Sequence, residues 1–228
     1  MSAFIFDVDG TLAETEEVHR LAFNAAFAEA NLPWHWDHYR YKELLRVSGG
    51  KERLRAFVDE DEIVPDTPLD ELIPGLHQAK TRHYGSAVLG GKMVLRPGVF
   101  DLVTEAHRRG IRLAIATTTS RDNVDSLLAT SFGGADLFEV IACGDMVPNK
   151  KPAPDIYLLA LQRLGLSTND CIAFEDSSNG LQAAKAAGLR CVVTPAEYTA
   201  DEDFIDADLV LADLTHADTV WRLLGTEP

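Results

Sequence analysis

An apolar run near the N-terminus of the chain ends in two carboxylates, because residues 4–11 read FIFDVDGT. Successive side chains of a β-strand point to opposite faces, so Asp7 and Asp9 lie on the same side and Val8 points away. Two unpaired carboxylates at the end of a buried strand repel each other and are costly to desolvate. The pair therefore indicates a metal site or an acid/base pair. A solvated turn at the end of a strand is the structural alternative.

Later apolar runs also end in polar side chains that suit ligand binding. Thr117, Lys151 and the pair Glu175 and Asp176 each come after such a run. Segments with helical periodicity separate the runs, which predicts parallel strands whose carboxyl ends share one edge of a sheet. Ligands bind at that edge in open α/β sheets. We therefore expect one site, in which carboxylates bind Mg²⁺ while a hydroxyl and an ammonium bind a phosphoryl group.

The motifs that carry these residues resemble, in order, those of the haloacid dehalogenase-like phosphohydrolases. They read DVDGT, ATTTS, KKPAPDIY and FEDSSNG. Within that superfamily the chain is similar to the CbbY-type sugar phosphatases, through FDVDGTLAETEEVHR, YKELLRVSGGKERL, LRPGV and IRLAIATTTS. The resemblance spans nearly the whole chain. It implies an α/β fold, with a Rossmann-like parallel sheet core and an inserted α-helical cap domain.

A helical segment interrupts the strand–helix alternation after the first strand. Apolar residues recur there at helical spacing over about 75 residues. Its position corresponds to the cap of the resembled family, so we expect a core of residues 1–13 and 92–228 and a cap of residues 14–91. The crossings at 13–16 and 89–92 would then act as hinges. Within the cap, helices are expected up to 30, over 37–47 and 51–59, and up to about 88. In the core we expect helices over 98–109, 121–131, 154–165 and 178–187, strands over 111–117, 138–143, 170–174, 189–194 and 208–211, and a terminal helix.

The composition favours a globular protein that acts on a small molecule. The 228 residues are 46% hydrophobic and 25% charged, and their formal net charge of −15 disfavours binding to nucleic acid or to an anionic membrane. No apolar stretch approaches membrane-spanning length and no basic leader precedes the first strand, so we expect a cytoplasmic protein, and we expect it to be a monomer. Cys143, Cys171 and Cys191 lack the spacing of zinc or disulfide frameworks and are expected to be reduced core residues. No G-x-G-x-x-G follows the first strand, which argues against a dinucleotide cofactor.

Catalysis is assigned to the two carboxylates after the first strand. A carboxylate can attack phosphorus and form an acyl phosphate that water then hydrolyses, so Asp7 is the expected nucleophile. Asp9 would protonate the leaving oxygen and later deprotonate the attacking water. Carboxylates of Asp7 and Asp176 are expected to bind Mg²⁺, with Glu175 as a further ligand or an orienting group. The resemblance implies that the backbone carbonyl of Asp9 also binds the metal.

The transferring phosphoryl group needs hydroxyl, amide and ammonium donors. Thr117 is the principal hydroxyl candidate, although a threonine that simply ends a strand is the structural alternative. The family match selects Lys151 over its neighbour Lys150. The expected phosphate-binding residues are Asp7, Gly10, Thr117, Thr118 and Lys151.

The cap is expected to determine which substrate is bound. The resemblance implies that its substrate-facing residues are Glu17, His19, Tyr41, Lys51, Arg53 and Lys80. Glu17 and His19 do not share one stripe of a helix, so at least one of them is expected to face solvent. The Ser-Gly-Gly segment at 48–50 opens a helix and is followed by two cations, which makes it a plausible seat for a second phosphate.

The resemblance implies a Mg²⁺-dependent phosphatase that converts xylulose 1,5-bisphosphate, an inhibitory by-product of Rubisco, to xylulose 5-phosphate in a Calvin-cycle organism. A β-phosphoglucomutase-like sugar phosphomutase and a generic sugar-monophosphate phosphatase share the core motifs and stay open. A phospho-accepting signalling receiver is a more remote alternative. The helical insertion and Asp9 count against it, because a receiver needs neither a capped pocket nor an acid for a leaving group.

Overall fold

The computed structural model describes residues 1–91 and 93–225, and within them it contains a parallel sheet with helices on both faces. The strands lie in the order β3-β2-β1-β4-β5-β6. Phe6 in β1 lies opposite Ile115 in β2 and Phe174 in β4, so the residues after these strands leave the sheet at one edge. The strands are β1 (Ala3–Phe6), β2 (Arg112–Ala116), β3 (Val140–Ala142), β4 (Cys171–Glu175), β5 (Arg190–Val193) and β6 (Leu209–Val210).

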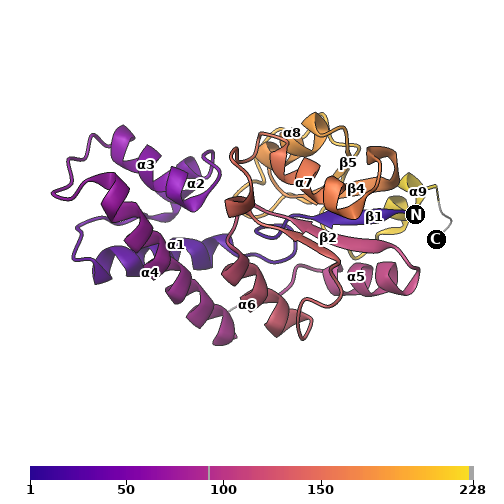
Figure 1. Cartoon of the computed structure of the whole chain (residues 1–228), viewed down its shortest axis with the longest axis horizontal. Coiled ribbons are helices and arrows are strands. Elements are labelled where there is room, and N and C mark those ends of the chain that lie inside the picture. Colours follow the sequence, from indigo (N-terminus) through magenta and orange to yellow (C-terminus); the bar gives the residue numbers. More distant parts are fainter. Residues whose placement is uncertain (92, 226–228) are drawn as a thin grey trace.

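Helices cover both faces of this sheet (Figure 1). One face packs against α5 (Val99–Arg108), α6 (Arg121–Ser131) and α9 (Asp218–Leu223), and the other against α7 (Asp155–Leu164) and α8 (Ser178–Ala186). In β1, Phe4 and Phe6 enter the first core while Ala3 and Ile5 enter the second. A strand that is buried on both faces must be apolar throughout, which explains the uninterrupted apolar run in the sequence. The predicted α/β fold is confirmed.

Four helices between β1 and α5 form a separate layer beyond the carboxyl ends of the strands (Figure 1). They are α1 (Glu16–Glu29), α2 (His38–Leu44), α3 (Gly50–Glu60) and α4 (Leu69–Leu89). Aromatic side chains from these helices and from the loop between α1 and α2 form a further core, in which the ring of Phe27 lies 5.0 Å from that of Trp36 and 6.5 Å from that of Phe57. This helical layer is called the cap below. The predicted domain boundaries stay a prediction, and residue 92 lies outside the described residues.

Several elements are shorter than the sequence pattern predicts. The strands expected over 138–143 and 208–211 contain only Val140–Ala142 and Leu209–Val210. Both lie at an edge of the sheet, where each has a hydrogen-bonded neighbour on one side only. The helix expected over 37–47 ends at Leu44, because the chain turns there toward the Ser-Gly-Gly segment.

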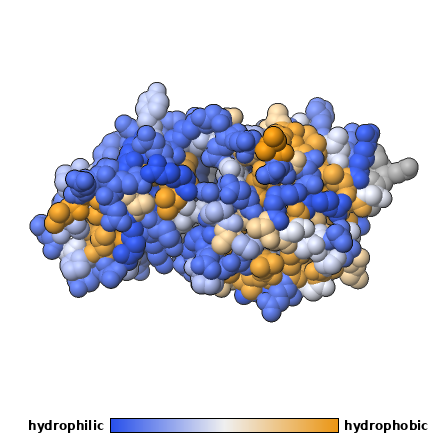
Figure 2. Space-filling view, turned by 90° about the horizontal axis from the view of Figure 1, so that it is seen from above, coloured by the Kyte–Doolittle hydropathy of each residue, from blue (hydrophilic) through white to orange (hydrophobic). Residues whose placement is uncertain are grey.

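The surface is mainly polar, as expected for a chain with 25% charged residues. Hydrophilic residues cover most of the face in Figure 2, and hydrophobic residues form small separate patches on it. Among the described residues, no helix is both long enough and apolar enough to cross a bilayer. The three cysteines are buried and unpaired, in agreement with the expectation that they are reduced core residues.

Candidate active site

The ends of β1 and β4 and the loop before α7 bring one ammonium and several carboxylates together. Lys151 Nζ lies 2.7 Å from Asp7 Oδ1 and 2.6 Å from Glu175 Oε1. Oxygen atoms of Asp7, Glu175 and Asp176 lie within 4.8 Å of one another, and all three residues are buried. The hydroxyl of Tyr157, on α7, also donates to Glu175 Oε1. The parallel topology therefore assembles the predicted cluster from positions that are far apart in the sequence.

The cluster carries more negative than positive charge. Burial raises the pKa of Asp7, and Glu175 raises it further, while Lys151 opposes the shift. Burial also raises the pKa of Asp176 well above its ordinary value, together with the neighbouring carboxylates. One ammonium bonded to two of three carboxylates leaves the site short of positive charge. A cation bound here would favour the ionised carboxylates.

The donor set fits a hard divalent cation. All of the clustered donors are carboxylate oxygens, which Mg²⁺ and Ca²⁺ prefer. Glu175 Oε2 is buried and has no hydrogen-bond partner among the described residues. From the residues that the structure describes, Asp176 Oδ2 receives only a long contact of 3.3 Å, from the hydroxyl of Thr199. Oxygens in this state have lone pairs available for a metal ion.

The backbone at Gly10 is shaped to admit the carboxylate of Asp176. Gly10 has a φ of +79°, and a Cβ atom there would lie 2.3 Å from Asp176 Oδ2. Only glycine combines this φ with so close an approach. The buried guanidinium of Arg96 donates to the carbonyls of Gly10 and Pro195, and so ties the loop after β1 to the loop after β5.

Asp9 is held by residues at the start of the cap. Its Oδ1 accepts hydrogen bonds from Thr15 Oγ1 at 2.6 Å and from His19 Nε2 at 2.9 Å. Burial raises the pKa of Asp9, but the interactions with His19 and Thr15 outweigh burial. The pKa of Asp9 is therefore lowered overall. Burial, with the nearby ammonium of Lys80, lowers the pKa of His19. The side chain of Val8 points into the core, as predicted.

A pocket between cap and core opens onto this cluster. His19, Arg53 and Lys80 line it from the cap side, and their predicted role in binding the substrate stays a prediction. Lys80 is 4% exposed, and its Nζ lies 5.2 Å from the ring centroid of Phe23 and 5.3 Å from that of Tyr84. Among the described residues no acceptor bonds to this ammonium, and Arg53 bonds only to the neutral oxygens of Tyr41, Leu44 and Val47. The pocket thus offers two cations without a bonded anion.

The other predicted cap residues do not line this pocket. Glu17 points away, toward Arg20 and Tyr198, and Glu16 lines the pocket instead, which corrects the predicted lining. Tyr41 lies behind the lining, where its hydroxyl donates to Glu16 at 2.7 Å. Lys51 pairs with Asp145 at 3.3 Å and borders a smaller adjacent cavity.

The phosphate-binding candidates differ in their exposure to the pocket. Thr118 and Lys151 line it. Thr117 is fully buried, and its Oγ1 accepts a hydrogen bond from the backbone amide of Thr119, which also lines the pocket. Gly10 does not appear in the lining, and it acts by admitting Asp176 to the cluster. The roles of these residues stay a prediction.

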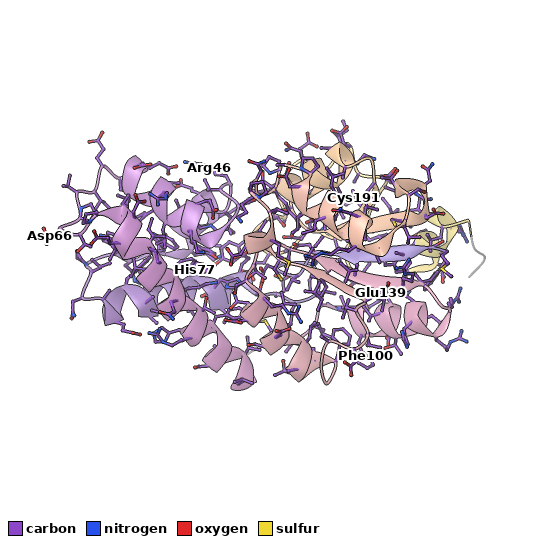
Figure 3. All side chains as sticks on the ribbon, in the orientation of Figure 1. Arg46, Asp66, His77, Phe100, Glu139 and Cys191 are labelled. Atoms are coloured by element: carbon purple, nitrogen blue, oxygen red, sulfur yellow. The ribbon has the colours of Figure 1, made fainter. Side chains whose placement is uncertain are left out.

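Sequence reasoning missed several lining residues. Glu16 shares a helical stripe with His19 and Phe23, so the spacing of three and four residues could have identified it. His77 on α4 lines both cavities, and Figure 3 shows it in the cap. Asn179 lines the pocket from the core, and its side-chain amide donates to the carbonyl of Arg46 in the cap. No local pattern in the sequence indicated these last two.

Comparisons with known proteins agree with this fold and identify the family. Residues 1–188 match the family of haloacid dehalogenase-like hydrolases. The CbbY protein of Rhodobacter capsulatus is 53% identical over 221 residues, which is 96% of each chain. The crystal structure of CbbY from Rhodobacter sphaeroides in complex with phosphate superposes with a TM-score of 0.89 at 48% identity, over 95% of this chain and 96% of that one. A mutant of that protein in complex with xylulose-1,5-bisphosphate gives a TM-score of 0.89 at 49% identity, with the same coverage. The chain therefore belongs to the haloacid dehalogenase-like hydrolases and is a phosphatase of that family.

Proposed function

We propose that this phosphatase hydrolyses a sugar bisphosphate with the aid of Mg²⁺, and that its substrate is xylulose 1,5-bisphosphate. The observation that carries the proposal is the position of two cap cations that bond to no anion among the described residues, Arg53 and Lys80, in a pocket that is also lined by the carboxylate cluster. One phosphate of the substrate would lie on the core cluster and the other against the cap. The related CbbY mutant that holds xylulose-1,5-bisphosphate supports this choice of sugar.

In the first step Asp7 attacks the phosphorus atom. A new bond forms between a carboxylate oxygen of Asp7 and phosphorus, and the bond between phosphorus and the sugar oxygen breaks. Asp9 gives its proton to that oxygen. A phosphate dianion beside Asp9 raises its pKa, which favours the protonated form that this step needs. Mg²⁺, held by Asp7, Asp176 and the Asp9 carbonyl with Glu175 nearby, would supply positive charge that offsets the repulsion between nucleophile and phosphate.

In the second step water attacks the aspartyl phosphate. Asp9, now ionised, takes a proton from the water, and the bond between Asp7 and phosphorus breaks to release inorganic phosphate. Lys151 contacts Asp7 directly. Its ammonium would therefore stabilise the negative charge on the phosphoryl group that Asp7 receives. Thr118 also lines the pocket and would be a further donor. At the end of the cycle Asp7 is again ionised and Asp9 is again protonated.

The cap would recognise the distal phosphate and the sugar hydroxyls. The Ser-Gly-Gly segment lines the pocket, and Gly50 begins α3, whose N-terminal amides favour an anion. Arg53 and Lys80 add two positive charges near it. Glu16 and His19 present polar groups to the sugar from α1. Binding energy from this distal end can be used to close the cap over the reacting phosphate.

In the cell this activity would remove an inhibitor of Rubisco and so serve the Calvin cycle. We propose a monomeric protein located in the cytoplasm. The net charge of −15 supports a small-molecule substrate over nucleic acid or a membrane, because both of these repel an acidic protein.

Phosphate release from a panel of sugar phosphates tests the proposal. The purified protein is incubated with Mg²⁺ and xylulose 1,5-bisphosphate, ribulose 1,5-bisphosphate, xylulose 5-phosphate or p-nitrophenyl phosphate. We expect kcat/KM for xylulose 1,5-bisphosphate to exceed that for its epimer by at least about 10²-fold, since oriented polar groups around the sugar discriminate strongly. Equal turnover of the two epimers would indicate a generic sugar phosphatase. An isomeric sugar phosphate in place of released phosphate would indicate a mutase.

A further inference from the structure

Tyr198 belongs to the core by sequence but packs inside the cap. It follows β5, yet its side chain is a member of the apolar cluster formed by the cap helices and is 3% exposed. Its ring stacks on His38 with centroids 4.4 Å apart and meets Tyr41 edge to face at 5.7 Å. Its hydroxyl donates to Glu17 Oε2 at 2.7 Å. Tyr198 is therefore a contact between the two parts of the molecule.

The residue next to Tyr198 contacts the carboxylate cluster. Thr199 Oγ1 donates to the backbone carbonyl of Asp176 at 2.8 Å and lies 3.3 Å from Asp176 Oδ2. The same hydroxyl accepts a hydrogen bond from the amide of Ala196, which closes a tight turn around Tyr198. Thr199 is 5% exposed. This short turn thus links the cluster to the cap, because Thr199 contacts Asp176 while Tyr198 packs among the cap residues.

The cap residues that Tyr198 touches lead to the pocket. Tyr41, packed against the Tyr198 ring, donates to Glu16 at 2.7 Å and accepts from Arg53 Nη1 at 3.0 Å. Glu16 and Arg53 both line the pocket, whereas Tyr41 does not. Glu17, the acceptor for Tyr198, is adjacent to Glu16 on α1. A shift of Tyr198 would therefore move two pocket residues through Tyr41 and α1.

We propose that Tyr198 is a positioning residue that determines substrate selectivity, because it holds Glu16 and Arg53 in register with the core carboxylates. The inference rests on the proposed function, since it requires that the cap select a phosphorylated sugar. Tyr198 itself touches no reacting atom, so its effect falls on the sugar and distal phosphate. The transfer of a small phosphate ester, which needs only the core, does not depend on the bond between the Tyr198 hydroxyl and Glu17.

The test compares Tyr198→Phe with Tyr39→Phe. Tyr198→Phe keeps the ring and removes only the hydroxyl that binds Glu17, whereas Tyr39 is 81% exposed on the same cap and serves as the matched control. The readout is the ratio of kcat/KM for the sugar phosphate that the wild type prefers to kcat/KM for p-nitrophenyl phosphate. We expect Tyr198→Phe to lower this ratio about tenfold, the effect of losing a hydrogen bond to a charged group, at an unchanged Mg²⁺ requirement. Tyr39→Phe should leave the ratio unchanged.

The proposal would be overturned if Tyr198→Phe lowered kcat/KM equally for the sugar phosphate and for p-nitrophenyl phosphate, or if it changed neither value. If Tyr198→Phe does not fold, Glu17→Gln weakens the same bond from the cap side and must lower the same ratio. Glu17→Gln also weakens the ion pair between Glu17 and Arg20. If both variants fold, their effects in the double variant must still be less than additive, because both remove the bond between Tyr198 and Glu17. The wild-type panel judges the proposed function separately. If the wild type prefers another phosphosugar, only the assignment of xylulose 1,5-bisphosphate as substrate is refuted. If it prefers no sugar phosphate, both the proposed function and the proposed role of Tyr198 are refuted.

Discussion

Replacing Gly10 by alanine tests how the loop after β1 serves the carboxylate cluster. Gly10 has a φ of +79°, a conformation that costs an L-residue about 1–2 kcal/mol. The added Cβ would also lie 2.3 Å from Asp176 Oδ2, whereas ordinary contact begins at 3.4 Å, so the carboxylate has to move. A displacement of about 1 Å in a reacting group costs about 10²-fold in rate. We expect Gly10→Ala to lose about 10²-fold in kcat and to need more Mg²⁺ for half-maximal rate.

Gly110→Ala is the matched control, because Gly110 has a φ of +75° and an added Cβ there would meet no atom of the described residues within 4 Å. Both variants carry the same backbone strain, which lowers Tm by about 2–8 °C for a protein of this size. Thermal unfolding therefore measures the shared strain, and phosphate release titrated with Mg²⁺ measures the displaced carboxylate. If Gly10→Ala matches Gly110→Ala in rate and in Mg²⁺ requirement, Asp176 is not the group that this glycine accommodates.

The remaining predictions address the catalytic groups and the cap. Asp7→Asn should reduce phosphate release by about four orders of magnitude at an unchanged Tm, because the covalent route is lost; activity near that of the wild type would refute the mechanism. Asp9→Asn should cost about 10²- to 10⁴-fold, measured as kcat on the same substrate. Excess chelator should abolish turnover and Mg²⁺ should restore it, so persistent activity in chelator would show that the cluster is not a metal site. Burial lowers the pKa of Lys80 to about 8, so its ammonium is lost above that pH. The value of kcat/KM for the bisphosphate should therefore fall as pH rises through about 8, and Lys80→Met should lack this fall; an identical pH profile in the variant would exclude Lys80.

The sequence alone determined the core and its cluster because the relevant patterns are local. The apolar run before Asp7 predicts a strand buried on both faces, and alternation along it directs Val8 into the core, where the structure places it. Parallel strands must end at one edge, so Lys151, Glu175 and Asp176 could be placed together without coordinates. Strand lengths at the sheet edges were less predictable, because they depend on the number of hydrogen-bonded neighbours.

Tertiary structure decided which cap residues face the pocket. Helical periodicity shows that Glu16 and His19 share a stripe and that Glu17 does not, but it does not show which stripe meets the core. That choice depends on how the cap packs on the core, and Tyr198, separated from Glu17 by most of the chain, takes part in it. Packing of this kind depends on side chains that meet only after the chain has folded, so no short window of sequence contains it.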